Sequence, residues 1–332
     1  MPADRRDNPV LQALLLLVGV WLAWRLRDVV LLVFAAAIVA ALLRALSDPL
    51  ARVTGWPERV AVLVAALGLL LLLVACLWAL GEPLARQLQE LRTALPRAWA
   101  AAREWLEKTP LGLKLLELGD DASRDVAIPW SRLASVATVA TGALADLLLI
   151  VLMGVYLALD PGLYRRGLLR LVPPSRRSAV GDALERSGDG LKRWLVGQGV
   201  AMAVVGITVG VGLALLGVPV APALGFISGL LEFVPFLGAI ASALLSILVA
   251  FAQGPQQALY VAIFFLVIQQ LEGNVVIPFV QRWAVHLPPV LSLLAVVVSG
   301  AIFGVPGVVF GTPLMVVTLV LVDRLYVRAL EG

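Results

Sequence analysis

The chain alternates long apolar runs with polar segments along most of its length. A helix needs roughly 20 apolar residues to cross the hydrocarbon core of a bilayer. Six runs predict membrane-spanning helices: Leu11–Trp24, Val29–Leu46, Val60–Leu80, Val136–Leu159, Val196–Leu216 and Ala258–Val280.

Two further apolar stretches, residues 219–252 and 288–322, are too long for a single span. Both contain the pattern S-G-x4-V-P, at residues 228–235 and 299–306. Paired apolar segments that are interrupted by Gly and Pro indicate the binding site of a transporter. We therefore expect two helix-break-helix hairpins, with breaks at Gly229, Pro235, Gly238, Gly304, Pro306, Gly307, Gly311 and Pro313.

Two polar segments separate the apolar runs. Residues 82–132 carry eight Lys/Arg and eight Asp/Glu, and their leucines recur at helical spacing, which predicts an amphipathic helical subdomain outside the bilayer core. Residues 160–193 carry eight Lys/Arg against four acids. Because Lys and Arg near spans favour the cytoplasmic side, we expect residues 160–193 to form a basic cytoplasmic loop.

Counting spans outward from that loop predicts the topology. Both termini become cytoplasmic and residues 82–132 face outside. The charge rule also places Arg282 in the cytoplasm if residues 219–252 and 288–322 are re-entrant hairpins that enter from opposite faces. Such an inverted arrangement builds many secondary transporters around a site at the midplane of the membrane.

The predicted fold is an all-α integral membrane protein with about eight membrane helices or hairpins, including two re-entrant hairpins broken by Gly and Pro and an amphipathic helical insert. Glycine is concentrated in the second half, with GxxxG pairs that let helix backbones approach closely, as at Gly206/Gly210 and Gly225/Gly229. We divide the chain into scaffold helices (1–81), the amphipathic subdomain (82–132), the fourth span with the basic loop (133–195) and a glycine-rich transport unit (196–332).

Composition supports the membrane assignment and argues against an enzyme. The 332 residues are 61% hydrophobic and 14% charged, against about 25% charged in a soluble domain. A single Cys and a single His cannot build a Cys/His metal site or a Ser-His-Asp triad, and no Walker loop occurs. We expect no enzymatic activity, no cofactor, no metal site and no nucleic-acid partner.

Acidic residues within the apolar stretches are the best candidates for chemistry, because a charge in the bilayer is costly and usually functional. Glu232 lies at the first break, and Asp146 lies in the fourth span. Glu272 belongs to the polar cluster Gln269, Gln270, Glu272 and Asn274 within an apolar span. Broken helices also expose N–H and C=O groups that bind anions and cations, and Thr312 adds a hydroxyl beside the break at Pro313.

Several motifs resemble the autoinducer-2 exporter family of bacterial permeases. They are Gly197-Gln198, Leu216-Gly217-Val218, Glu232-Phe233-Val234-Pro235-Phe236-Leu237-Gly238, Glu272-Gly273-Asn274-Val275-Val276-Ile277-Pro278, His286-Leu287-Pro288-Pro289 and Gly304-Val305-Pro306-Gly307.

The resemblance implies a multi-pass protein of the bacterial inner membrane that forms homo-oligomers and moves a transport unit against a static scaffold. Members are associated with export of the furanosyl quorum-sensing signal, and some with sodium–proton exchange. Many relatives have Lys after the proline at 278, where this chain has Phe279, so that Arg282 is the only nearby cation that could replace it.

Three functions are consistent with these features. The main interpretation is a secondary permease for a small polar solute, with Glu232 and Glu272 coupling transport to a proton or cation. The second is a sodium(cation)–proton antiporter that uses the same acids. The third is a scaffold in the lipid bilayer that does not transport but binds an envelope partner through residues 82–132.

Overall fold

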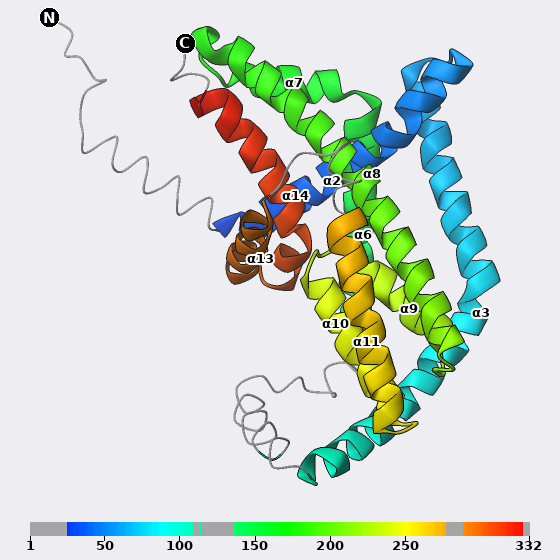
Figure 1. Cartoon of the computed structure of the whole chain (residues 1–332). Coiled ribbons are helices and arrows are strands. Elements are labelled where there is room, and N and C mark those ends of the chain that lie inside the picture. Colours follow the sequence, from blue (N-terminus) through cyan, green and yellow to red (C-terminus); the bar gives the residue numbers. More distant parts are fainter. Residues whose placement is uncertain (1–24, 109–112, 114–135, 277–287, 328–332) are drawn as a thin grey trace, which may run out of the picture.

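The computed structural model describes residues 25–108, 113, 136–276 and 288–327, and every regular element in these ranges is a helix (Figure 1). The elements are α2 (Arg27–Thr54), α3 (Glu58–Glu107), α6 (Val136–Leu159), α7 (Pro161–Arg170), η1 (Pro174–Arg176), α8 (Arg177–Leu215), α9 (Ala221–Leu231), α10 (Leu237–Phe251), α11 (Pro255–Leu271), η2 (Glu272–Val276), α13 (Pro289–Phe303), α14 (Val305–Val322) and η3 (Asp323–Val327). The expected span Leu11–Trp24 lies outside the described residues.

Three of the described helical segments are long and apolar enough to cross a membrane: Arg27–Thr54, Pro174–Leu215 and Val305–Val327. A fourth candidate is the pair formed by residues 145–159 and 161–170, which is bent by 88°. Together with the shorter apolar helices α9, α10 and α13, they make the chain a multi-pass membrane protein. The full set of eight membrane segments stays a prediction.

The stretch 160–193 differs from the expected loop, because most of it is helical. Asp160 ends α6 and its Oδ1 accepts a hydrogen bond from the backbone N–H of Leu163, while Pro161 occupies the first turn of α7. An acidic N-cap followed by Pro is a strong helix start. The basic residues therefore lie on α7 and on the beginning of α8, which continues without a break into the apolar run 196–215.

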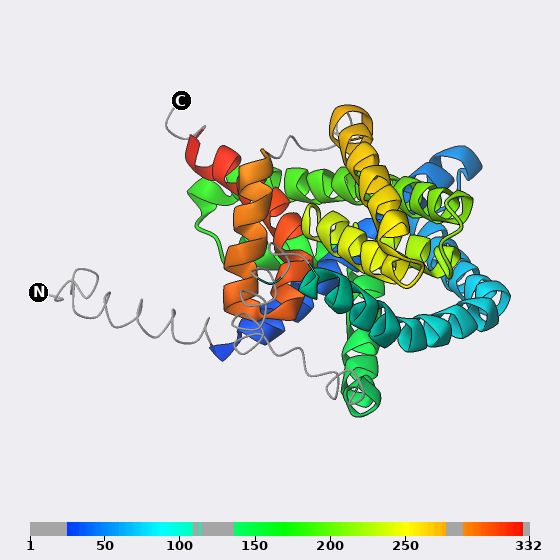
Figure 2. The same cartoon turned by 60° about the horizontal axis from the view of Figure 1, so that its bottom comes forward.

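The amphipathic segment also differs in its connection to the rest of the chain. Helix α3 runs for 50 residues through Pro83 and Pro96, so no break separates residues 58–81 from residues 82–107. In Figures 1 and 2 its second half curves beneath the ends of α10 and α11. Leu91 belongs to the apolar core of α8–α11, and Trp105 stacks obliquely on Phe251 at 5.8 Å between ring centroids.

Both expected hairpins have the helix-break-helix form. In the second, Gly307 approaches the backbone of Ser299 and Gly311 approaches that of Ala295, so α13 and α14 run antiparallel. In the first, α10 folds back onto the end of α9 so closely that a Cβ on Gly238 would collide with the carbonyl of Leu231. Re-entry of these hairpins into the bilayer from opposite faces stays a prediction.

The GxxxG pairs of α8 and α9 lie face to face. A Cβ added to Gly225 would lie 2.5 Å from the Cα of Gly210 and 2.7 Å from the carbonyl oxygen of Gly206. A Cβ added to Gly229 would lie 2.8 Å from the carbonyl oxygen of Met202. These helices therefore touch backbone to backbone, which confirms the close approach that the sequence predicts.

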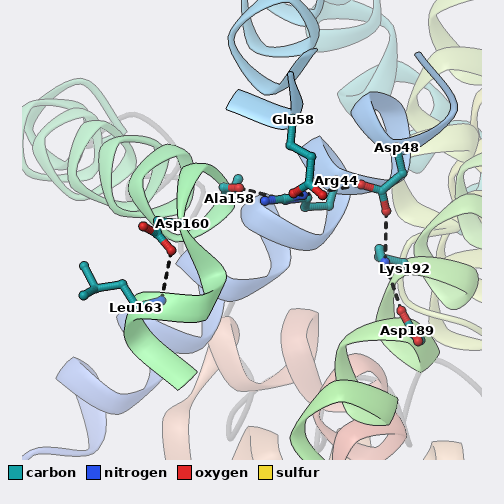
Figure 3. A network of polar contacts seen from close by, with 8 residues as sticks. All are labelled: Arg44, Asp48, Glu58, Ala158, Asp160, Leu163, Asp189 and Lys192. Atoms are coloured by element: carbon teal, nitrogen blue, oxygen red, sulfur yellow. Dashed lines mark hydrogen bonds and ion pairs between the residues drawn. The ribbon is translucent and has the colours of Figure 1, made fainter. Parts of the chain in front are cut away.

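An ion-pair network ties the scaffold to α8 at one end of the molecule (Figure 3). Arg44 donates from Nε to the carbonyl of Ala158 at 2.8 Å and pairs with Glu58 at 2.8 Å. Lys192 of α8 pairs with Asp48 of α2 at 3.1 Å and with Asp189 at 2.9 Å. The end of α2, the start of α3 and the basic stretch 160–193 thus meet at one end of the molecule, which is here called the basic end.

We expect Gly225→Ala to lower the free energy of unfolding by about 1–3 kcal/mol, because the added methyl group has only backbone to displace. The matched control is Gly199→Ala in α8, where nothing lies within 4 Å of the added Cβ. The control should leave stability unchanged or raise it slightly. Unfolding of the purified protein by steric trapping measures both, and equal stability of the two variants would contradict the close contact.

We expect Arg44→Met to lower the free energy of unfolding by about 1–3 kcal/mol, because it leaves the Ala158 carbonyl and Glu58 without their partner. The control is Arg86→Met, which removes an ion pair to Glu82 from a side chain that is 72% exposed. Exposed pairs contribute less than about 1 kcal/mol. A cost for Arg44→Met no larger than for the control would show that the network does not hold the scaffold to its neighbours.

Candidate functional site

The centre of the candidate site is the break between α9 and α10. Glu232 follows the last residue of α9 and its side chain is buried, with 3% of the residue exposed. The chain then turns through Val234, Pro235 and Phe236 before α10 begins at Leu237. Phe236 has a φ of +65°, an unusual value for a bulky residue, and such outliers cluster at functional sites.

Glu272 lies at a second irregularity, where α11 gives way to the π-helical turn η2. Single π-helical turns are frequent at functional sites. Its side chain is also buried, and its carboxyl group lies close enough to that of Glu232 for the two to interact. The structure thus brings together the two acids that sequence analysis proposed, although 40 residues separate them in the chain.

The surroundings of the two carboxyl groups are poor in positive charge among the residues that the structure describes. Within the described part of the chain, no Lys or Arg forms an ion pair with Glu232 or Glu272. One carboxyl oxygen of Glu232, Oε2, is buried without a donor from the described residues. Two carboxylates close together at a buried position repel each other, and a small cation bound between them would relieve that repulsion.

Two residues of helix α8, Gln198 and Trp194, contact the chain at and next to Glu232. Gln198 donates from Nε2 to the backbone carbonyl of Glu232 at 2.5 Å and is itself buried. One turn earlier, Trp194 meets the ring of Phe233 edge to face, with 5.8 Å between centroids. A carbonyl freed by the helix break therefore has a donor, as buried backbone groups require, and the break is fixed in place by two contacts.

The second break lies in a separate part of the site. Gly304, with a φ of +67° and a ψ of −146°, connects α13 to α14, and Pro306 stands in the first turn of α14. Gly307, Gly311, Thr312 and Pro313 are all buried along α14. Phe233 packs against the apolar cluster that contains Val316 of α14 and also Trp194 of α8. No described contact joins Thr312 to the acids.

The polar cluster of α11 and η2 is divided by the structure. Glu272 is buried, whereas Gln269, Gln270 and Asn274 are exposed on the other side of the helix. Asn274 donates from Nδ2 to the backbone carbonyl of Gln270 at 2.8 Å and to its side-chain Oε1 at 3.3 Å, so its amide N–H groups have partners on the same helical turn. Asp146 is exposed on α6. Arg282 and Pro278 lie outside the described residues.

Sequence analysis missed part of the site. Gln198 entered only as part of the motif Gly197-Gln198, and Trp194 was not singled out. Ser228 and Ser246, on α9 and α10, are buried with hydroxyls that have no partner among the described residues. A lone Gln at the start of an apolar run was an available signal for Gln198. The sequence contained no such signal for Ser228 and Ser246, because a single Ser in an apolar helix is common.

Comparison with known proteins gives a consistent result. The family model described as "AI-2E family transporter" matches residues 11–326. "Putative transport protein MT0215" of Mycobacterium tuberculosis is 27% identical over 270 residues, which cover 78% of this chain and 73% of that protein. "Putative permease PerM" of Escherichia coli is 27% identical over 203 residues, which cover 60% and 55%.

A shorter match involves "Putative transport protein YrrI" of Bacillus subtilis, which is 27% identical over 158 residues, or 48% of this chain and 45% of that protein. The matched part of the chain thus spans about half the length of this relative. The family resemblance inferred from the motifs is confirmed by the extent of the family match.

Proposed function

Because the chain belongs to the AI-2E family of transporters, we propose that it is a secondary permease that exports a small polar solute across the bacterial inner membrane. Autoinducer-2 or a related metabolite is the proposed solute. The names of the relatives support transport in general, since they are called transport proteins or permeases.

The observation that carries this proposal is the buried contact between the carboxyl groups of Glu232 and Glu272. In a low-dielectric site, two like charges in contact interact unfavourably, and no described cation relieves them. A proton or sodium ion that binds there would change the charge of the break and so bias its conformation. The pair is therefore the proposed coupling site.

The proposed solute pathway passes along the two helix breaks. Glu232 lies at the first break, and Phe233 connects it to the cluster that contains α14. Buried hydroxyls on the short helices offer hydrogen bonds to a polar solute: Ser228, Ser242, Ser246, Ser292, Ser299 and Thr312. The exposed amides Gln269, Gln270 and Asn274 are proposed as an outer part of this pathway, reached from the far side of η2.

The proposed motion is a displacement of residues 196–332 against the scaffold of residues 1–81. Two kinds of contact support this division. The α8–α9 contact is backbone to backbone, so these helices would move as one body. At the basic end α8 is attached to α2 by the ion pair of Lys192 with Asp48, and next to it by apolar side chains such as Ile38 and Leu191 that can slide past each other.

A cation–proton antiporter is the second candidate, and the same carboxyl pair favours it, because exchange of two cations needs only one acidic site that binds each in turn. A scaffold that binds an envelope partner through residues 82–132 is less well supported. The described part of that segment is engaged within the chain, since Leu91 and Trp105 pack against the apolar core and Phe251.

The deciding experiment compares Glu232→Gln, Glu272→Gln and the exposed control Glu90→Gln in proteoliposomes. We expect both site variants to lose gradient-driven autoinducer-2 efflux by about fivefold or more, the lower end of typical coupling free energies, with the control unchanged. Loss of sodium–proton exchange by a protein that never moves autoinducer-2 would assign the antiporter function. Full activity of both site variants in both assays would overturn the coupling role of the pair.

The proposed topology can be tested with single cysteines in a Cys76→Ala background. We expect a membrane-impermeant thiol reagent added to intact cells to label Gln253→Cys, at the exposed turn between α10 and α11. Ala284→Cys, which lies outside the described residues, should be labelled only after the cells are opened. Labelling of position 284 from outside would mean two full crossings and would remove the opposed re-entrant hairpins from the proposal.

A further inference from the structure

A cavity of about 450 Å³ opens at the basic end, between α8, the end of α14 and the start of α13. Arg186 and Arg193 line it from α8, and Arg324 and Asp323 line it from η3. Leu291 and Leu319 contribute an apolar wall. Figure 1 shows the last turns of α14 next to the first half of α8, where these residues meet. None of them belongs to the carboxyl pair.

The cavity has an excess of positive charge. The Arg186 guanidinium binds both carboxylate oxygens of Asp182, at 3.0 and 3.1 Å. Arg324 is 3.5 Å from Asp182 and 3.5 Å from Asp323. Arg193 donates only to the backbone carbonyl of Asp189, at 3.3 Å, and has no carboxylate partner among the described residues. Three guanidinium groups thus share two carboxylates.

The sequence spacing explains why these groups converge. Residues 186, 190 and 193 follow one another at intervals of four and three, so they lie on one face of α8. Gly190 stands between the two arginines and leaves the space between them open. Residues 319 and 323, four apart, and residues 320 and 324, also four apart, line the cavity from the facing helix. Like charges directed at one cavity from two helices are destabilising unless an anion joins them.

The shape and polarity of the cavity indicate the kind of anion. Guanidinium groups match the oxygens of a phosphate, and basic pockets between membrane helices on the cytoplasmic side bind anionic lipid headgroups. The apolar wall of Leu291 and Leu319 suits the start of an acyl chain rather than a fully hydrated ion. We propose that this cavity binds the phosphate group of an anionic phospholipid, with the guanidinium groups of Arg186, Arg193 and Arg324 as its ligands.

A lipid in this position would join α8 to the end of α14. An ion pair already joins them there, the long contact of Arg324 with Asp182 at 3.5 Å. A phosphate bound between Arg186, Arg193 and Arg324 would offset the repulsion between their guanidinium groups and would pair with all three. Occupancy would thus hold the basic ends of two helices together, independently of what happens at Glu232 and Glu272.

The test uses the purified full chain in a neutral detergent. Pyrene-labelled phosphatidylglycerol and phosphatidylcholine are titrated, and energy transfer from tryptophan reports binding. We expect the wild-type chain to prefer phosphatidylglycerol. The double variant Arg186→Gln/Arg193→Gln should weaken phosphatidylglycerol binding by about 25-fold, or about fivefold for each guanidinium removed. Phosphatidylcholine binding should change little.

The matched control is Arg166→Gln/Arg170→Gln, which removes two exposed arginines of α7 at the same end of the molecule but outside the cavity. It should keep the preference for phosphatidylglycerol. An equal loss in the control pair, or no preference in the wild-type chain, would overturn the proposal.

A further arm separates a lipid from a free phosphate. Inorganic phosphate in large excess should not displace labelled phosphatidylglycerol, because it cannot use the apolar wall. Full displacement by inorganic phosphate would show that the cavity takes a free anion and would overturn the lipid assignment. Circular dichroism checks that the double variant is folded. If it is not, Arg193→Gln alone takes its place, and a fivefold loss of phosphatidylglycerol binding is expected for it.

Discussion

The register between α8 and α9 is the constraint on which the rest of the structure depends. Residues 198, 202, 206 and 210 recur every four positions along α8 and form one stripe. Gly210 faces Gly225, Gly206 and the carbonyl of Met202 face Gly229, and Gln198 reaches the carbonyl of Glu232. Backbone contact at the glycines leaves no room for sliding. The position of the first break, and of the acid it carries, follows from that contact.

Charged side chains are paired at one place in the molecule and left without a described base at another. At the basic end, acids and bases are paired in a network that spans three helices, from Glu58 through Arg44 and Asp48 to Lys192. At the carboxyl pair, two acids meet with no described base. The first arrangement is expected where a structure must be held, and the second where it must respond to an ion.

The sequence predicted elements that depend on local pattern and missed those that depend on packing. Apolar runs, the S-G-x4-V-P repeat and GxxxG spacing gave the helices, the two breaks and the α8–α9 contact. Asp160 and Pro161 were read as part of a loop, although together they start a helix. The continuity of α3 through Pro83 and Pro96 could not be foreseen, because Pro inside a helix usually ends it and only packing against α10 favours continuation.

The candidate site was predictable only in part for the same reason. Glu232 and Glu272 stood out because an acid in an apolar run is costly wherever it points. The direction of each side chain was not encoded locally: Glu272 turns inward, whereas Gln270 and Asn274 turn outward and bond each other. Gln198 was found only when the fold placed it beside an interrupted helix.

The length of helix α3 has a consequence for how distant parts of the molecule are connected. Its 50 residues would extend about 75 Å if straight, more than twice the roughly 30 Å of a hydrocarbon core. At its start Glu58 holds Arg44, and farther along Gln87 accepts a hydrogen bond from the N–H of Ala223 at the head of α9. A single continuous helix therefore contacts both the basic end and the head of the first hairpin, so that these two distant parts of the molecule are joined through one element.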